Sequence, residues 1–272
     1  MSGSERGILY VATGDRFVAE ARLSALSAKQ HMPDLPTLLY TDRPVPAGSP
    51  FDEVRRLESP RHFFVDKVAP LAESPFERTL FLDTDTFVCA PVYDLFTLLD
   101  RYDLALAHAP LRHDRPFTTP TCFAELNTGV IAYRPNRSVK DLIARWASIY
   151  EEEVARSGPV SDQAAFRQAA YESAAKLYIL PSEYNLRTVM PAATGRGTVK
   201  IIHGRAPDLS RLADRLNRSR AIRVFLPSLR DLDPANFIIL TAPGRLLGGI
   251  FAIGTRTWRL LETLKRRLFG SR

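Results

Sequence analysis

The chain has 272 residues, 45% of them hydrophobic, which is enough for one large α/β domain or for a domain with an appendage. Its formal net charge is +7, but positions 245–272 hold seven Arg or Lys side chains against one acidic residue, so the rest of the chain is close to neutral. This distribution argues against a nucleic-acid-binding domain, and we expect no nucleic-acid partner.

The cysteine content and the N-terminus indicate where the protein resides. Cys89 and Cys122 are too few for a disulfide framework, which indicates a reducing compartment. The N-terminus runs directly into a strand-like segment, without the basic and long apolar regions of a secretory signal. No stretch reaches the roughly 18 consecutive apolar residues that a membrane-spanning helix needs. We therefore expect a cytoplasmic protein.

Short apolar, β-branched runs alternate with helix-like stretches, which predicts an α/β fold with a mainly parallel central sheet covered by helices. Ligands of such sheets bind beyond the carboxyl ends of the strands, so the polar residues that follow each strand are the first site candidates. Strands are expected at Ile8–Ala12, Thr37–Tyr40, Thr79–Leu82, Leu104–Ala107, Gly129–Tyr133, Leu177–Leu180 and Val199–Ile202, and helices at Ala19–Lys29, Val65–Ala72, Val139–Glu153 and Asp162–Glu172.

Two carboxylates stand two positions apart after the apolar run Leu80–Leu82, in the order Asp83-Thr84-Asp85. Burying carboxylates at the end of a core strand is costly unless they are paired or coordinate a metal. Their hard oxygen atoms suit Mn²⁺ or Mg²⁺, which can also hold a diphosphate. For this motif alone, a solvated pair of aspartates at a strand end is an equally weighted alternative.

A second enzyme class uses a similar motif. Phosphatases of the haloacid dehalogenase type carry an aspartate nucleophile in a DxDx(T/V) motif after a strand, and residues 83–86 fit its first four positions. Phe87 breaks the fifth position, and the motif normally lies near the start of its domain. A phosphatase with Asp83 as nucleophile is therefore the alternative.

Two later polar clusters have both a structural and a functional interpretation. Asn127-Thr128-Gly129 directly precedes a strand, where a plain turn is the simpler interpretation. Asp162-Gln163 opens an Ala-rich helix, where Asp162 can serve as a cap and nothing more.

His203 ends a predicted strand and is followed by Gly204 and Arg205. A single histidine at a strand end is more often structural than a ligand. Here, however, the glycine and the arginine can present backbone amides and a fixed positive charge to a phosphate. The imidazole can also complete the coordination of a metal held by Asp83 and Asp85.

The order of these features resembles glycosyltransferase family 8, and glycogenin-like enzymes in particular. The resemblance implies a GT-A fold and a transferase that moves a hexose or N-acetylhexosamine from a nucleotide diphosphate sugar, with UDP as the expected nucleotide. We accordingly place a catalytic domain at residues 1–205 and a basic extension at 206–272. The matching motifs are strand-Thr-Gly-Asp, Asp-Lys-Val, LFLDTDTFV, LNTGVIAY, SDQ, LPSEYNL and IIHG, which cover about residues 8–205.

The resemblance also implies a role for each matching residue. The implied metal ligands for Mn²⁺ or Mg²⁺ are Asp83, Asp85 and His203; the donor contacts are Ala12, Thr13, Phe17, Lys67, Thr84, Thr128, Gly129, Gly204 and Arg205; and the residues expected at the transferred sugar in a catalytic role are Asn127, Asp162 and Gln163.

Two departures from the family pattern affect donor binding. After the histidine the family has a Gly and then Lys-Pro-Trp, whereas this chain continues with Gly-Arg-Ala-Pro, so that Arg205 stands in for the lysine. Gly14 occupies the place of the family's uridine-binding asparagine.

Similarity to this family also implies that the anomeric configuration of the sugar is retained. The metal and Arg205 would stabilise the leaving diphosphate. No carboxylate base is assigned, and we hypothesise that a leaving-group oxygen deprotonates the acceptor while Asp162 and Gln163 orient the sugar.

The C-terminal stretch has apolar residues at helical spacing and arginines on the opposite side, which predicts an amphipathic helix at about 245–269. Such a helix can lie in a membrane interface, with its cations on anionic headgroups, or pack on the catalytic domain. We favour the membrane surface. This places the protein at the inner face of the membrane, with a glycan or glycolipid acceptor.

Two further alternatives remain at this point. A nucleotidyltransferase shares the fold and the metal requirement, but usually has a Gly-rich basic loop after the first strand, and this chain lacks one. A non-catalytic nucleotide-sugar-binding protein is disfavoured because Asp83, Asp85 and His203 are all present.

Overall fold

The computed structural model describes residues 4–109, 118–158, 160–188 and 197–219, and the backbone of 193–195, 223–227 and 237–241. The amphipathic helix predicted at about 245–269 lies outside these residues. The strands are β1 (Arg6–Ala12), β2 (Thr37–Thr41), β3 (Glu53–Arg56), β4 (Arg78–Leu82), β5 (Thr86–Val88), β6 (Leu104–His108), β7 (Leu126–Tyr133), β8 (Leu177–Leu180), β9 (Leu186–Arg187), β10 (Ala193–Gly195), β11 (Ile201–His203), β12 (Arg223–Pro227) and β13 (Phe237–Thr241). The helices are α1 (Asp15–His31), α2 (Val68–Ala72), α3 (Asp94–Leu98), α4 (Arg137–Ser157), α5 (Gln163–Glu172) and α6 (Leu209–Asn217), with short 3₁₀ turns at Phe64–Lys67 and Ser182–Tyr184.

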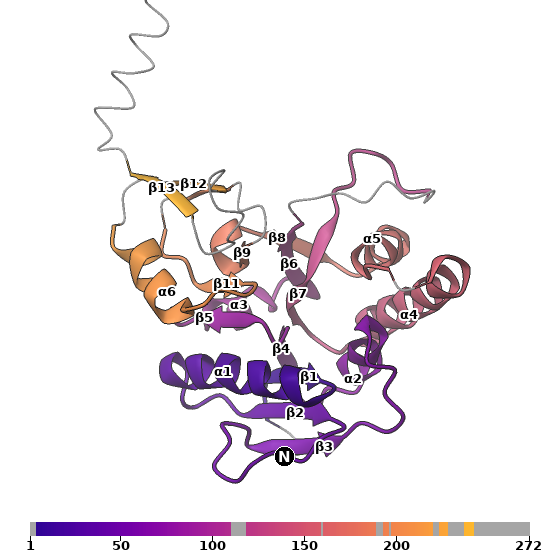
Figure 1. The fold of residues 1–272 in the computed structure, drawn as a ribbon. Helices are drawn as coiled ribbons and strands as arrows, with labels where there is room; N and C mark the ends of the chain where they lie inside the picture. Colours follow the sequence, from indigo (N-terminus) through magenta and orange to yellow (C-terminus); the bar gives the residue numbers. More distant parts are fainter. Residues whose placement is uncertain are drawn as a thin grey trace, which may run out of the picture.

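A seven-stranded sheet with the order β3-β2-β1-β4-β7-β6-β8 forms the centre of the molecule (Figure 1). Strands β3, β2, β1 and β4 are parallel to one another, as are β6 and β8. Strand β7 runs antiparallel to both of its neighbours. The prediction of a mixed α/β fold with a mainly parallel central sheet is therefore confirmed.

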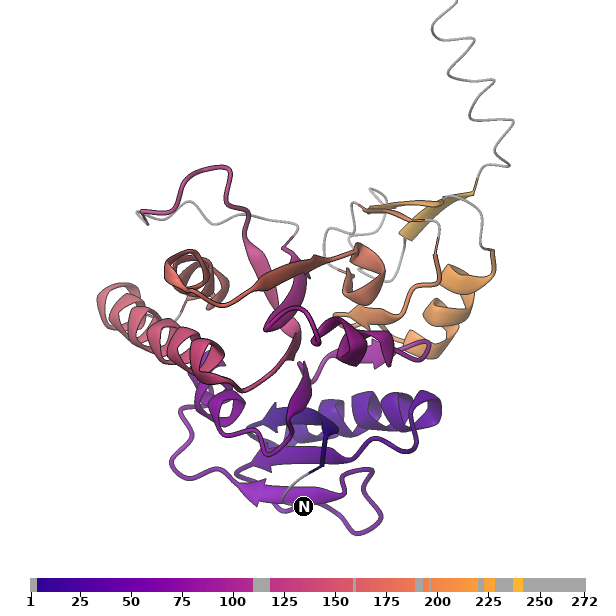
Figure 2. The same ribbon diagram turned by 180° about the vertical axis from the view of Figure 1, so that it is seen from behind.

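Helices cover both faces of this sheet, which explains why its strands read as continuous apolar runs rather than alternating ones. On β1, Ile8 and Tyr10 pack with α1 and α3, whereas Leu9 points to the other face and packs with α2, α4 and α5. The two views of the ribbon show α1 on one side of the sheet and the α4–α5 pair on the other (Figures 1 and 2).

The antiparallel direction of β7 brings its beginning to the same edge of the sheet as the end of β4. Leu82 pairs with Val130, and the Asp83 N–H donates to the Gly129 carbonyl at 2.8 Å. The polar residues that open β7 therefore lie beside those that follow β1 and β4, at the edge where ligands of parallel sheets bind.

A smaller sheet with the order β5-β11-β9 lies beside this edge. Strand β11 pairs antiparallel with β5, so that His203 lies opposite Thr86, and pairs parallel with β9, so that His203 lies opposite Arg187. Leu212, Ala213 and Leu216 of α6 pack with buried residues of β9 and β11. Part of the chain beyond residue 205 is thus packed on this sheet, and the division at 205 stays a prediction.

Several elements differ from the sequence prediction. Helix α1 begins at Asp15 rather than near Ala19, because Gly14 adopts a positive φ of 87° and turns the chain directly from β1 into the helix. Strands β3, β5, β9, β10, β12 and β13 and helices α3 and α6 were not predicted, because each is short and is held mainly by tertiary contacts. Within the described part of the chain, none of the helices has the length and apolarity to cross a membrane.

The buried face of β4 gives a test of the core. Leu80 on β4 is fully buried, whereas Leu23 on α1 is 64% exposed. Leu80→Ala should lower the free energy of unfolding by about 2–5 kcal/mol because it leaves a cavity in the sheet core. Leu23→Ala, the matched control, should change it by less than about 0.5 kcal/mol. Urea denaturation measures both, and equal effects would contradict this assignment of the core.

Candidate active site

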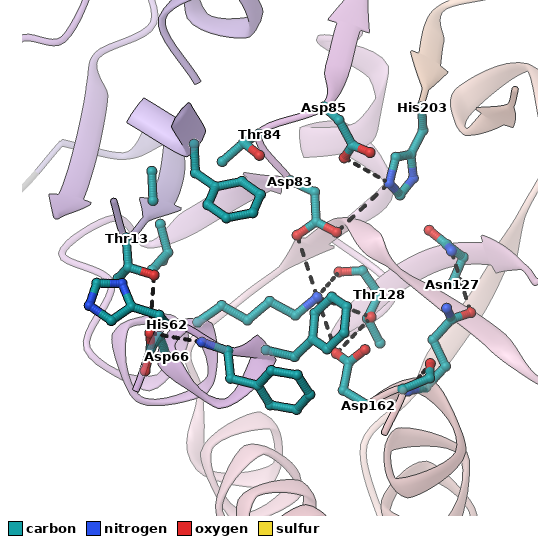
Figure 3. Close-up of a pocket in the computed structure, with 18 of the residues that line it drawn as sticks. Thr13, His62, Asp66, Asp83, Thr84, Asp85, Asn127, Thr128, Asp162 and His203 are labelled. Carbon is teal, nitrogen blue, oxygen red and sulfur yellow. Dashed lines mark hydrogen bonds and ion pairs between the residues drawn. The ribbon is translucent and has the colours of Figure 1, made fainter. Parts of the chain in front are cut away.

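A cavity of about 450 Å³ opens at the edge of the sheet where β1, β4 and β7 meet. It contains every site residue predicted from the sequence except Gly129 and Gly204. Figure 3 shows these side chains converging from separate segments of the chain. The lining residues are Val11, Ala12, Thr13, Phe17, His62, Phe63, Phe64, Asp66, Lys67, Asp83, Thr84, Asp85, Asn127, Thr128, Ser161, Asp162, Gln163, Arg187, His203 and Arg205.

Asp83, Asp85 and His203 form a cluster that could hold a metal ion. Each offers one ligand atom, and these atoms lie within 4.8 Å of one another. His203 Nε2 is 3.3 Å from Asp85 Oδ1 and 3.8 Å from Asp83 Oδ2 (Figure 3). Two carboxylates and an imidazole are a suitable donor set for a first-row divalent cation. The arrangement agrees with the predicted ligand set.

The two carboxylates differ in how readily they ionise. Burial raises the pKa of Asp83, and the carboxylates of Asp85 and Asp162 raise it further, although Lys67 and His203 oppose the shift. Burial also opposes ionisation of Asp85. There, however, the hydrogen bond to His203 and the charges of His203, Arg205 and Arg187 outweigh burial and hold the pKa of Asp85 below its ordinary value.

Lys67 connects the metal cluster to Thr128 on β7 and Asp162 before α5. This buried side chain places Nζ 3.4 Å from Asp83 Oδ1, 3.1 Å from Asp162 Oδ2 and 3.2 Å from Thr128 Oγ1 (Figure 3). Burial lowers its pKa, but the charges of Asp162 and Asp83 outweigh burial and raise the pKa above its ordinary value. Lys67 is therefore a fixed cation in the centre of the cavity.

Asp162 precedes α5 at the capping position, yet its side chain makes no capping hydrogen bond. Its Oδ2 instead accepts from Thr128 Oγ1 at 3.0 Å and pairs with Lys67. Trp146 holds the backbone at this point, because its indole N–H donates to the Asp162 carbonyl at 3.1 Å. The interpretation of Asp162 as a cap alone does not agree with this geometry.

A chain of side-chain amides links the metal cluster to the start of α5. His203 Nδ1 lies 2.9 Å from Asn185 Oδ1, and Asn185 Nδ2 donates to Asn127 Oδ1 at 2.8 Å. Asn127 Nδ2 in turn lies 3.4 Å from Gln163 Oε1. In the neutral imidazole with Nδ1 donating to Asn185, the lone pair is on Nε2, which faces the two aspartates, as a metal ligand requires; in the protonated ring both nitrogens donate, and the Nε2–H faces Asp85 instead.

Gly129 and Gly204 allow close approach of the chain at this cluster instead of lining the cavity. A Cβ on Gly129 would stand 1.9 Å from Cε1 of His203, so the imidazole is packed directly against the backbone of β7. Gly204 has a φ of 129°, and a Cβ there would stand 2.0 Å from Thr188 Oγ1. The Gly204 N–H donates to the Asp85 carbonyl at 2.8 Å. This bond joins the backbone after His203 to the backbone at Asp85.

The opposite end of the cavity is formed by the segments after β1 and before α2. Thr13 Oγ1 donates to Asp66 Oδ2 at 3.1 Å, and Asp66 also accepts from the backbone N–H groups of Arg61 and Phe63. The Phe17 ring stands 38% exposed on the first turn of α1. Thr13 and Asp66 thus lie on the side of the cavity away from Asn127 (Figure 3).

Four residues with contacts at the site were not predicted from the sequence. Arg187 Nη1 lies 2.9 Å from His203 Nε2, and burial is the main cause that lowers the pKa of this guanidinium. Asn185 orients His203, and Glu20 pairs with the side chain of Arg205. Asp66 holds the hydroxyl of Thr13. Asp66 and Asn185 stand in the Asp-Lys-Val and LPSEYNL motifs, which were the sequence signals for them, whereas Glu20 and Arg187 had none.

The charged side chains of the cavity do not balance. The carboxylates outnumber the cations by one, which gives a formal net charge of −1 without histidine. A bound divalent cation would reverse the sign and make the cavity attractive to an anion. The charged lining residues are Asp66, Asp83, Asp85 and Asp162 against Lys67, Arg187 and Arg205.

Comparison of the sequence with known protein families found no match. A search of curated proteins by sequence found no match either.

Comparison with solved structures finds the same fold in glycosyltransferases. The galactosyltransferase LgtC, solved in complex with donor and acceptor sugar analogues, superposes with a TM-score of 0.52 at 15% identity, over 74% of this chain and 87% of that one. An active-site mutant of LgtC gives a TM-score of 0.51 at 15% identity, over 78% and 94%. The glycosyltransferase GlyE of Streptococcus pneumoniae TIGR4 gives 0.53 at 15% identity, over 75% of this chain and 56% of that one. The architecture of this chain is therefore that of GT-A glycosyltransferases.

Proposed function

We propose that the protein is a metal-dependent glycosyltransferase that moves a sugar from a nucleotide diphosphate donor. The observation that carries the proposal is the cluster of Asp83, Asp85 and His203 at the rim of a cavity that also holds Lys67 and Arg205. The fold shared with LgtC and GlyE and the resemblance to glycosyltransferase family 8 support the same conclusion.

The charge balance of the cavity supports the metal requirement. Without a cation, the excess carboxylate would repel the diphosphate of a donor. Asp83, Asp85 and His203 would hold Mn²⁺ or Mg²⁺, which when bound supplies positive charge to a leaving diphosphate.

The side chains around the cluster have distinct roles in this proposal. Arg205 contacts the diphosphate, because it lies beside Asp85 at the open edge of the cavity. Lys67 forms an ion pair with both Asp83 and Asp162, which offsets the repulsion between the two carboxylates and fixes their positions. Asn127 and Gln163, joined at 3.4 Å, present their amides to the transferred sugar.

The finer points of the reaction are also proposals. We infer a hexose or N-acetylhexosamine on UDP as the donor, with the base near Ala12, Thr13 and Phe17, and a glycan or glycolipid as the acceptor. Retention of configuration follows from the resemblance to family 8, with a leaving-group oxygen taking the acceptor proton. Cytoplasmic location and attachment to an anionic membrane through the C-terminal helix are inferred from the sequence.

The phosphatase alternative requires Asp83 to attack a phosphate ester. In this structure both oxygens of the Asp83 carboxylate face nitrogen groups of other side chains, Oδ1 toward the Lys67 ammonium and Oδ2 toward the His203 ring. The shared fold also favours the transferase. The phosphatase and a non-catalytic nucleotide-sugar-binding protein are kept as outcomes of the experiment that follows.

The proposal predicts metal-dependent stabilisation and turnover of one nucleotide sugar. Thermal unfolding and donor hydrolysis are measured with a panel of nucleotide sugars in the presence of Mn²⁺, Mg²⁺ or a chelator. One donor should raise the melting temperature and be slowly hydrolysed only when metal is present, and Asp83→Asn should abolish both effects. Stabilisation without turnover would indicate a binding protein, and hydrolysis of simple phosphate esters would indicate the phosphatase.

Gly129 gives a second test, which does not depend on turnover. Gly129→Ala should displace the His203 imidazole from the two aspartates and weaken Mn²⁺ binding by at least about tenfold, a typical loss when the support of a ligand is removed. Gly197→Ala is the control, because Gly197 does not have a positive φ and a Cβ there would meet Glu183 Oε1 at 3.7 Å, an ordinary van der Waals contact. Calorimetric Mn²⁺ titration measures both. Unchanged affinity in Gly129→Ala would remove His203 from the ligand set.

The ionisation of Asp83 predicts how metal binding depends on pH. Because the pKa of Asp83 is raised and that of Asp85 is lowered, Asp83 takes up a proton first as the pH falls. A protonated carboxyl is a poor ligand, so Mn²⁺ affinity should be highest above the pKa of Asp83 and fall as the pH drops through it, with proton release on binding in that range. Titration in buffers of different ionisation enthalpy measures the released protons. Affinity that does not change with pH would contradict this order of ionisation.

A further inference from the structure

Arg205 follows β11 and is held by Glu20 on α1, a residue 185 positions away in the sequence. Arg205 Nε donates to Glu20 Oε1 at 2.8 Å, and Nη2 donates to Glu20 Oε2 at 2.9 Å. Two parallel bonds of this kind fix the plane of a guanidinium as well as its position. The orientation of Arg205 is therefore determined by Glu20.

The remaining nitrogen of Arg205 is directed to the metal cluster. Nη1 lies 3.5 Å from Asp85 Oδ2, and the guanidinium carbon lies 5.9 Å from the centre of the Phe17 ring. With Nε and Nη2 turned to Glu20, Nη1 faces the place where an anion would meet the metal. Glu20 occupies the Nε–Nη2 edge of the guanidinium, so its carboxylate does not cover Nη1.

Glu20 is itself held in place. Its carboxylate also accepts from Thr84 Oγ1 and from Arg16 Nε, each at 3.2 Å. Burial opposes its ionisation, but Arg205 and these two donors outweigh burial and lower the pKa of Glu20, so the carboxylate is charged at neutral pH. Glu20 thus joins α1, the Asp83–Asp85 loop and Arg205, although it does not line the cavity.

We propose that Glu20 is a positioning residue for the donor: it holds Arg205 with Nη1 toward the diphosphate, and this inference rests on the function proposed above. The Arg205 side chain is half exposed, so without Glu20 it would be free to adopt many rotamers. Binding a diphosphate would then require ordering of the Arg205 side chain, and that ordering costs affinity. Glu20 acts only through Arg205 and does not contact the donor.

The test measures binding of nucleoside diphosphates in the presence of Mn²⁺ by calorimetry, using UDP, GDP and ADP as probes. Glu20→Ala should weaken binding of the preferred diphosphate by about 2- to 12-fold, the equivalent of ordering one long side chain. Once a turnover assay exists, the loss should be found in the KM for the donor and not in kcat. Glu172→Ala is the matched control, because Glu172 pairs with Arg145 through both oxygens and neither residue lines the cavity.

A double-mutant cycle separates this role from a structural one. If Glu20 acts through Arg205, the variant with both Glu20→Ala and Arg205→Ala should bind as weakly as Arg205→Ala alone. If Glu20 acts through the Thr84 loop, its effect will persist in the Arg205→Ala background, and the inference is wrong. Thermal unfolding checks each fold, and Glu20→Gln replaces Glu20→Ala if that variant is unfolded.

The outcomes for the inference and for the proposed function are distinct. If the wild type binds one diphosphate and Glu20→Ala binds it equally or more tightly, the positioning role is overturned while the proposed function stands. If the wild type binds none of the diphosphates with Mn²⁺, the proposed function fails and the inference fails with it.

Discussion

The site is organised around one buried cation. Lys67 is almost fully enclosed, and an enclosed ammonium group is stable only with anionic partners at contact distance. Asp83 and Asp162 supply these partners from two different segments, one at the end of β4 and one at the start of α5. The positions of α5 and of the end of β4 are therefore set relative to each other by charge neutralisation as well as by apolar packing.

The rest of the polar network follows from this pairing. Asp83 offers one oxygen to Lys67 and the other to the side of His203, so it belongs to the central ion pair and to the metal cluster at once. From His203, hydrogen bonds continue through Asn185 to Asn127. Displacement of any member would leave a buried polar group without its partner, which explains how side chains from distant segments keep one arrangement.

The sequence predicted the parts of this arrangement that depend on local pattern. Asp83 follows an apolar strand, and polar residues at strand ends meet at one edge of a mainly parallel sheet, so the place of Asp83 was predictable. His203 lies on β11 of the smaller sheet, and it was predicted as a ligand from its chemistry and the family resemblance rather than from the sheet. Glu20 was not, because a glutamate on a helix surface has no local feature that separates it from a solvated residue. Arg187 and β9 were missed for a related reason, since a two-residue strand exists only through its pairing with β11.

The short ladder between β5 and β11 has a consequence for the dynamics of the molecule. The predicted metal ligands stand on two segments that are joined at this point by three paired residues, including Thr86 with His203. Such a ladder can open locally without disturbing the seven-stranded sheet, and the amides of residues 201–203 would report that opening through hydrogen exchange. An ion that binds only the closed ladder would stabilise it by mass action, so the occupancy of the site and the local stability of the small sheet are thermodynamically linked.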